Sequence, residues 1–265
     1  MGGAVGALDL WEMSVCPMLL NNCSTWTQIS ESSIEQLEEL QNMFVRVLLH
    51  LPVSTPKPVL TFDTGLLSMR HRIMSAKLNF AHYLRVCGDD NLAGQVYEEQ
   101  VRRGWPGLSQ EVVDISTQIG LEDINNLEAS KVSSSVWKCK VKAAVTNHNE
   151  QCLKDNMGEK LKDIVNESFG RKEYLSSKSV EHSRTMIRIR SKMLHVKDNF
   201  KNMYKKRTNG LKCDSCLTQV ETQAHVLTCP AYNKLREGLQ LDKQDDLVKY
   251  YREVLMARDK KGNKK

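Results

Sequence analysis

The chain has 265 residues, of which 40% are hydrophobic and 26% are charged, the composition of an ordinary globular protein. No apolar run approaches the roughly 18–20 residues that a membrane-spanning helix needs. The N-terminus, MGGAVGALDLWEM, has no basic segment before an apolar core, which excludes a secretory signal. We therefore expect an intracellular protein, cytoplasmic, nuclear or both, that does not contact a membrane.

Positive charge is concentrated in one segment. The net charge of the chain is +6, whereas residues 171–207 contain 12 Lys and Arg against 3 Asp and Glu, or +9, which leaves 6 − 9 = −3 for the rest. Such a block favours a polyanionic partner. A solvated helix face would have the same composition, so charge alone leaves both interpretations open.

The first half of the chain predicts helices in succession, because apolar residues recur at three- and four-residue steps. A helix begins behind Ser32 and Glu35, which resemble a capping box, and ends at Pro52. The next helix ends near Cys87, and a CGDDN loop follows it. Lys77 lies on the apolar face of this helix, where only its aliphatic stem is expected to pack. A short helix is expected over residues 92–103, stopped by GWPG.

The second half begins with a weak polar region, residues 120–135, which is the best candidate for an internal boundary. Apolar spacing from Trp137 to Cys152 predicts a further helix. The clearest periodicity predicts one continuous helix with an apolar stripe toward the core and cations on the remaining face. The stripe consists of Met186, Ile189, Met193, Val196, Phe200 and Met203.

The fold is therefore expected to be mainly α, in four consecutive parts. These are a thumb-like helical region at 1–125, a helical linker with the basic amphipathic helix at 126–207, a small zinc-stabilised finger at 208–241, and a C-terminal helix with a basic tail at 242–265.

The segment KCDSCLTQVETQAHVLTC carries a predicted metal site. Cys213 and Cys216 have the Cys-x2-Cys spacing, and His225 and Cys229 have the His-x3-Cys spacing. Zn²⁺ prefers four tetrahedral thiolate and imidazole ligands, and a helix capped by Thr222 would place His225 and Cys229 one turn apart on one face. Two incidental cysteines and a core histidine are the alternative. Four protein ligands leave no open position, so the predicted Zn²⁺ is structural.

The remaining histidines are expected to be ordinary surface or core residues, because no ligand partners are evident for them in the sequence. They include His71, His82, His148, His182 and His195. The cysteines outside the finger are expected to be buried small hydrophobes.

Four stretches, in order, resemble the C-terminal part of non-LTR (LINE-type) retrotransposon reverse transcriptases. The stretch from VCPMLLNNC to STPKPVL resembles the thumb, and GLLSMRHRIMSAKLNFAHYLR resembles the helix after it. VEHSRTMIRIRSKMLHVKDNFKN is similar to the family's basic segment, and CDSCLTQVETQAHVLTCPAYNKLR to its Cys/Cys/His/Cys element. The resemblance covers roughly residues 11–240 and implies zinc binding and contact with RNA or DNA.

The chain departs from this family in its catalytic parts. A polymerase palm needs carboxylates on an apolar hairpin, whereas Asp89 and Asp90 lie in a predicted interhelical loop, and Asp245 and Asp246 resemble the acidic first turn of a helix. The residues after Cys229 are too few for a nuclease domain. We therefore expect no enzyme activity.

The leading functional hypothesis is a non-catalytic nucleic-acid-binding fragment or remnant, with RNA the more expected ligand and a full-length reverse transcriptase a possible partner. The alternatives are a zinc-stabilised protein-interaction module, and a part of an RNA-directed DNA polymerase that is active only with an upstream palm. The expected nucleic-acid-binding residues are the cations of the basic segment and the finger's first lysine. They are Arg184, Arg188, Arg190, Lys192, Lys197, Lys201, Lys205, Lys206, Arg207 and Lys212.

Overall fold

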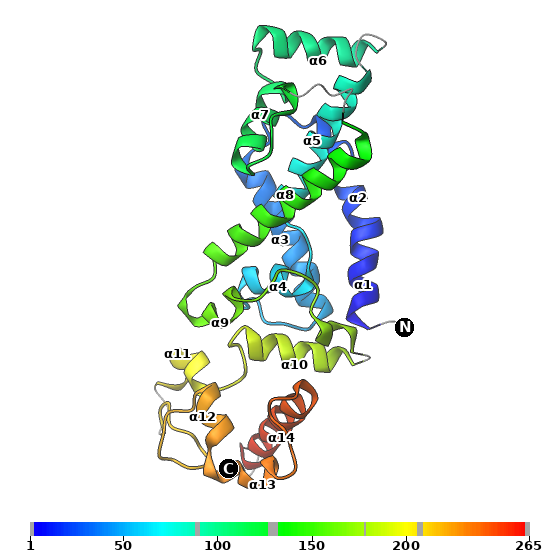
Figure 1. Ribbon diagram of the computed structural model, residues 1–265. Helices are drawn as coiled ribbons and strands as arrows, with labels where there is room; N and C mark the ends of the chain where they lie inside the picture. The colour runs from blue at the N-terminus through cyan, green and yellow to red at the C-terminus, as the bar shows by residue number, and fades with distance from the viewer. Residues whose placement is uncertain (1–2, 88–90, 127–131, 178, 206–208, 263–265) are drawn as a thin grey trace. The chain divides into compact units, whose positions relative to one another are not determined.

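The structure is a computed structural model that describes residues 3–87, 91–126, 132–177, 179–205 and 209–262 (Figure 1). It confirms the mainly α fold, since helices account for most of the residues described and the β-structure among them is one isolated bridge, between Lys212 and Val220. None of the helices in these ranges is both long and apolar enough to cross a membrane.

The chain divides into two compact units. Unit 1 comprises Met1–Ala7, Val45–Thr64 and Met157–Lys265, and unit 2 comprises Leu8–Phe44 and Gly65–Asn156. Two helices, α1 (Ala4–Leu10) and α3 (Glu31–Leu48), contain residues of both units. This partition differs from the four consecutive ranges expected from the sequence, which remain a prediction.

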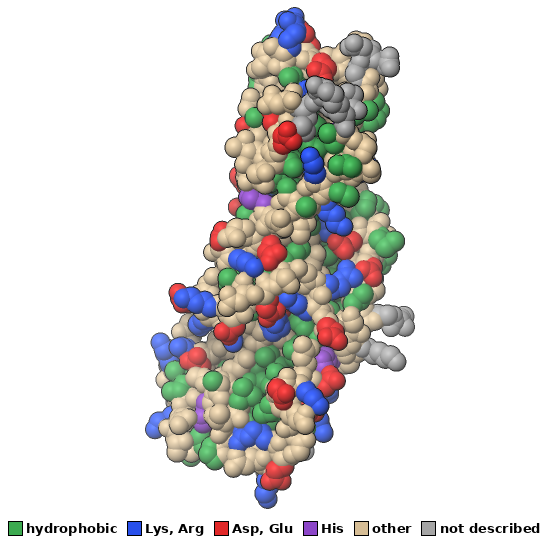
Figure 2. All heavy atoms as spheres, viewed as in Figure 1, with side chains coloured by type: hydrophobic (Ala, Val, Ile, Leu, Met, Phe, Trp, Pro, Cys, Tyr) green, Lys and Arg blue, Asp and Glu red, His purple; other side chains and the backbone are tan. Residues whose placement is uncertain are grey.

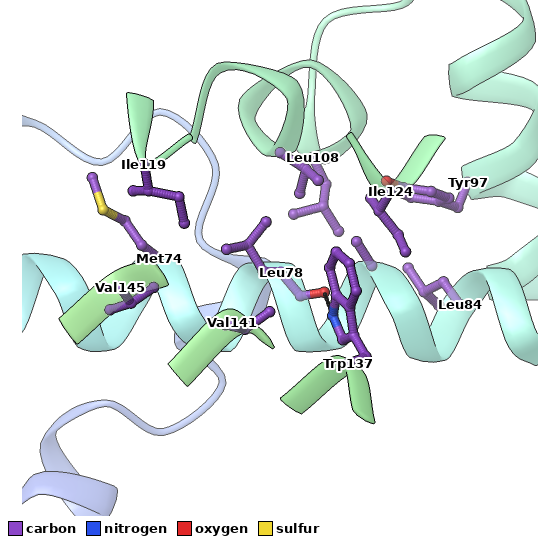
Figure 3. Close-up of a cluster of buried hydrophobic side chains, with 12 residues drawn as sticks. Met74, Leu78, Leu84, Tyr97, Leu108, Ile119, Ile124, Trp137, Val141 and Val145 are labelled. Atoms are coloured by element: carbon purple, nitrogen blue, oxygen red, sulfur yellow. Dashed lines mark hydrogen bonds between the residues drawn. The ribbon is translucent and has the colours of Figure 1, made fainter. Parts of the chain in front are cut away.

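Unit 2 is built around a pair of long helices that pack along one another, α5 and α8. Their shared core contains Leu78, Trp137 and Val141, and the Trp137 indole Nε1 donates to the Leu78 carbonyl at 3.1 Å (Figure 3). The helices of this unit besides α1 and α3 are α2 (Cys16–Leu19), α5 (Met69–Cys87), α6 (Leu92–Arg103), α7 (Leu108–Gln118) and α8 (Ser134–Asp155), with a π-helix at Trp11–Val15 and 3-10 turns at Cys23–Thr25 and Ile124–Asn126.

Lys77 buries more than its stem. Its side chain is 5% exposed, and its ammonium forms an ion pair with Glu111 inside unit 2. The sequence-based prediction that only the stem of Lys77 packs was therefore wrong.

Unit 1 packs α10 against α4 and α14. Every residue of α4 from Val59 to Thr64 is buried, and α14 buries Tyr250, Tyr251 and Val254. The helices of this unit are α4 (Lys57–Thr64), α9 (Lys162–Val165), α10 (Val180–Arg190), α11 (Lys201–Tyr204), α12 (Gln223–Thr228), α13 (Asn233–Arg236) and α14 (Gln244–Gly262), with 3-10 turns at Glu159–Leu161, Glu173–Ser176, Lys197–Phe200 and Pro230–Tyr232.

The continuous basic helix predicted over the apolar stripe is wrong. Helix α10 ends at Arg190, and Lys192 takes a left-handed conformation with φ of 55°. The Met193 amide then donates to the Arg188 carbonyl at 2.8 Å, and the Lys192 amide to the Ile189 carbonyl at 3.2 Å. This pair of bonds is a Schellman motif, which satisfies the last carbonyls of a helix and reverses the chain.

Helix boundaries elsewhere follow local capping chemistry. The Asn91 side chain accepts from the Ala93 amide at 2.9 Å to start α6, which covers residues 92–103 as predicted. The cap of α3 is Ser30 rather than Ser32, because Ser30 Oγ accepts from the Ser33 amide at 3.2 Å. Asp245 lies in the acidic first turn of α14, also as predicted, whereas Asp89 and Asp90 lie outside the described residues.

Candidate metal centre

Residues 212–222 form a short arm closed on itself, and helix α12 (Gln223–Thr228) follows it. The Cys213 amide donates to the Gln219 carbonyl at 2.8 Å, and the Leu217 amide to the Cys213 carbonyl at 2.8 Å. Leu217 adopts a left-handed φ of 59°, which turns the chain directly after Cys216. Thr222 caps α12 as predicted, with its Oγ1 accepting from the His225 amide at 2.9 Å.

This local fold brings the four predicted ligands together. Their ligand atoms all lie within 4.8 Å of one another, so they form a candidate metal-binding group. The Sγ atoms of Cys213 and Cys229 are 4.0 Å apart, and Cys216 Sγ is 3.4 Å from His225 Nε2. Cys213, Cys229 and His225 are buried, whereas Cys216 is half-buried.

Neighbouring polar groups prepare these side chains for a cation. His225 Nδ1 lies 2.8 Å from Gln219 Oε1, a contact that assigns the proton to Nδ1 and leaves the Nε2 lone pair facing Cys216. The Thr218 hydroxyl donates to Cys216 Sγ at 3.1 Å and is the main cause that lowers the pKa of this thiol to about 6. Burial raises the pKa of Cys229 to about 11. One thiolate is therefore available at neutral pH before any ion binds.

The arm is held to the rest of unit 1 by buried charge. Lys197 is 3% exposed, and its Nζ donates to the Lys212 carbonyl at 2.8 Å and to Asp214 at 2.7 Å. Glu221 is 1% exposed; it accepts from the Lys197 amide at 3.2 Å and pairs with Arg258 of α14 at 2.8 Å. The ligand-bearing arm is thus packed between the 197–204 segment and α14.

Two of the expected nucleic-acid-binding cations are internal ion-pair partners instead. Lys197 is buried as described above. Arg190 donates to Asp63 from Nε at 2.6 Å and from Nη2 at 3.0 Å, and to Glu167 from Nη1 at 2.8 Å. For these two residues the expectation of a free cation was wrong. Arg190, in the last turn of α10, faces the buried Asp63, and Lys197 lies beyond the end of that helix, where it pairs with Asp214.

The other expected cations differ in their pairing. Arg188 donates to the His50 carbonyl at 2.9 Å, Lys192 pairs with Asp163 at 3.0 Å, and Lys201 pairs with Asp198 at 3.0 Å. The face drawn in Figure 2 accordingly shows Lys and Arg side chains interspersed with Asp and Glu side chains.

Arg184 lies 3.7 Å from Glu181, which makes it a loosely paired cation. Lys205 and Lys212 are exposed, and no carboxylate among the described residues pairs with either. Lys206 and Arg207 lie outside the described residues.

A second group of ligand-type side chains was missed by the sequence reasoning. His71, His148 and Cys152 have ligand atoms within 4.8 Å of one another in unit 2, although both histidines were expected to have no ligand partner. Burial, followed by the charges of His148 and Arg70, lowers the pKa of His71 to about 4. The segment HNEQC carries a His-x3-Cys spacing that could have indicated the second pair, but His71 is 77 residues away from His148 in sequence.

Neither a family model, a curated protein nor a solved structure matches the chain. The resemblance to non-LTR reverse transcriptases therefore remains a prediction from the quoted segments.

Proposed function

We propose that the group of Cys213, Cys216, His225 and Cys229 binds a structural Zn²⁺. Tetrahedral coordination with Zn–S bonds of about 2.3 Å and Zn–N bonds of about 2.0–2.1 Å separates two ligand sulfurs by about 3.8 Å and a sulfur from a nitrogen by about 3.5 Å. The 4.0 Å between Cys213 and Cys229 and the 3.4 Å between Cys216 and His225 fit these separations. Four protein ligands fill the coordination sphere, so the ion stabilises the arm and carries no substrate.

The Zn²⁺-stabilised arm serves, in this proposal, as a non-catalytic nucleic-acid-binding element. One observation carries the proposal: Lys212 directly precedes the ligand Cys213, and both Lys212 and Lys205 are exposed without a carboxylate partner in the described part of the chain. Lysines of this kind bind phosphate oxygens through Coulomb attraction and release of counterions.

Internal charge pairing sets the position of these lysines. Lys197 neutralises Asp214 of the arm and donates to the backbone of Lys212, which fixes the segment that carries Lys201 and Lys205 beside the arm. Arg258 and Glu221 neutralise each other on the α14 side. Lys197 and Arg258 are therefore paired internally, and the exposed Lys205 and Lys212 are left for an external anion.

The resemblance of the basic segment and of the Cys/Cys/His/Cys element to non-LTR reverse transcriptases favours RNA as the ligand, and a full-length enzyme of that kind as a partner. Aromatic residues make up 6% of the chain, which offers little for base stacking, so we expect recognition of RNA shape and phosphates.

A salt titration of RNA binding tests the proposal. The Lys201→Gln/Lys205→Gln/Lys212→Gln variant is expected to bind a structured RNA more weakly than the unaltered protein. The slope of log affinity against log salt should fall by about 2.1–2.7, since each of the three phosphate contacts contributes roughly 0.7–0.9. Filter binding between low and moderate salt measures both quantities.

A matched control removes the same charge elsewhere. Lys138→Gln/Lys140→Gln/Lys142→Gln changes three exposed lysines of α8 in unit 2 and should leave the salt slope unchanged. Equal slopes for both variants and the unaltered protein would contradict the proposed surface. A protein captured by the zinc-loaded chain in the absence of RNA binding would favour the protein-interaction alternative instead.

A further inference from the structure

Two helices of unit 2 bring together three side chains that bind transition metals. His71 lies on α5, and His148 and Cys152 lie on α8. His71 Nε2 is 2.8 Å from His148 Nδ1, and Cys152 Sγ is 3.7 Å from His148 Nδ1 and 3.8 Å from its Nε2. One imidazole nitrogen from each ring and one sulfur therefore converge on a single point.

The pair on α8 repeats the spacing of the finger. His148 and Cys152 are separated by three residues, as are His225 and Cys229. On a helix this spacing places two side chains on the same face one turn apart, so both can reach one ion. His71 supplies a third ligand from the helix that packs against α8.

The tautomer of His71 is set by its surroundings. Ser68 Oγ lies 2.7 Å from His71 Nδ1, and we assign the proton of the neutral ring to Nδ1, which donates to that oxygen. Glu38 of α3 accepts from the neighbouring Arg70 amide at 3.0 Å. The lone pair of His71 Nε2 then points toward His148. A hydrogen bond from the other ring nitrogen to a fixed oxygen is of the kind that orients metal-ligating histidines.

The nearby cation Arg70 is neutralised in part. Its guanidinium donates to Glu31 at 3.0 Å, so the site faces an ion pair rather than an isolated positive charge. His71 is buried, whereas His148 and Cys152 are half-buried, so an ion has access from solvent.

We propose that His71, His148 and Cys152 form a second metal site, which binds a divalent transition ion of the zinc type. Two imidazoles and one thiolate suit zinc and cobalt and disfavour the oxygen-seeking magnesium and calcium. On binding, the Cys152 thiol releases its proton to solvent, both imidazoles stay neutral with one N–H each, and the fourth position of the ion is open to water. The ion links α5 to α8, the two central helices of this unit.

Metal stoichiometry of the full chain tests the proposal. The protein is stripped by chelation, reloaded with Co²⁺ or Zn²⁺ alone, desalted and analysed for bound metal. We expect two equivalents in the unaltered protein and one in both His148→Gln and Cys152→Ser. Cys152→His restores a ligand and should return two, and Cys139→Ser, which changes an exposed cysteine of the same helix, should keep two.

This experiment tests the finger site and the second site separately. Cys213→Ser/Cys229→Ser removes the finger site and should leave one equivalent, whose cobalt spectrum reports a single thiolate instead of three. One equivalent of bound metal in the unaltered protein, with no loss in Cys152→Ser, would contradict the second site but not the finger site. Two equivalents in both His148→Gln and Cys152→Ser, with helical content unchanged, would also overturn it.

Discussion

The guanidinium of Arg190 binds two carboxylates at once, and one of them, Asp63, is fully buried. Tyr174 also donates to Asp63, at 2.7 Å, and burial together with that carboxylate raises the pKa of Tyr174 well above its ordinary value. The hydrogen bond from Arg190 is the main cause that lowers the pKa of Glu167 to about 2. Asp63 therefore accepts hydrogen bonds from Arg190 Nε, Arg190 Nη2 and the Tyr174 hydroxyl, and Arg190 is its cationic partner.

Replacing Arg190 with alanine is expected to destabilise unit 1 by about 3–5 kcal/mol, because Asp63 becomes an unpaired buried charge. Lys192→Ala, two residues on, breaks an exposed pair with Asp163 and should cost no more than about 1 kcal/mol. Urea unfolding, monitored by circular dichroism, measures the free energy of unfolding of both variants. Similar losses for the two variants would contradict the assigned role of Arg190.

His71 should make the stability of unit 2 depend on pH. Its pKa is about 4 in the folded chain and about 6.5 when unfolded, so the unfolded state binds more protons between these values. The free energy of unfolding should therefore fall as pH drops from 6.5 toward 4, by about 2 kcal/mol between pH 7 and pH 5.

The four tryptophans of the chain, Trp11, Trp26, Trp105 and Trp137, all belong to unit 2, so their fluorescence follows its unfolding in urea. In metal-free protein, the free energy of unfolding of His71→Gln should fall between pH 7 and pH 5 by about 2 kcal/mol less than that of the unaltered protein. An identical dependence in both proteins would mean that His71 titrates normally when folded.

Among the elements, α14 holds the candidate metal centre in place. The Tyr250 hydroxyl donates to the Val226 carbonyl and accepts from Arg236 at 3.2 Å, and Arg236 also donates to the Cys229 carbonyl at 2.9 Å. These bonds join α14 to the helix turn between the ligands His225 and Cys229.

Tyr250→Phe leaves the Val226 carbonyl without its donor, at a cost of about 1–3 kcal/mol. Zinc should therefore leave the finger faster, which a colorimetric chelator competition measures. Tyr83→Phe changes an exposed tyrosine of unit 2 and serves as the control. Equal release rates would show that α14 does not support the centre.

The elements also show what the sequence could predict. The helix over residues 92–103, the Thr222 cap and the four finger ligands follow from contacts within a few residues, and local chemistry predicted them. The end of α10 was not predicted from the sequence, because the apolar spacing continues beyond Arg190. A lysine in the left-handed conformation, as at Lys192, is also atypical of a helix end. The meeting of His71 with His148 depends on helix packing, which no local pattern encodes.

At the scale of the whole molecule, the two units should respond separately to loss of the finger ion. Cys213→Ser/Cys229→Ser is expected to speed amide hydrogen exchange in residues 212–236 and in α14, which packs on them. The α5 and α8 core around Trp137 should keep its protection. Cys139→Ser is the matched control, since its thiol is exposed on α8. Faster exchange throughout unit 2 would mean that the finger ion stabilises the entire chain.

The ion pair between Asp63 and Arg190 can form only late in the synthesis of the chain. The two residues are 127 positions apart, so at about 5–20 residues per second the ribosome completes Arg190 roughly 6–25 s after Asp63. Throughout that interval α4, whose residues Val59–Thr64 are buried in the finished protein, lacks α10, the helix that packs against it. Residues 65–156, the larger part of unit 2, are therefore synthesised before α10 is available to cover α4.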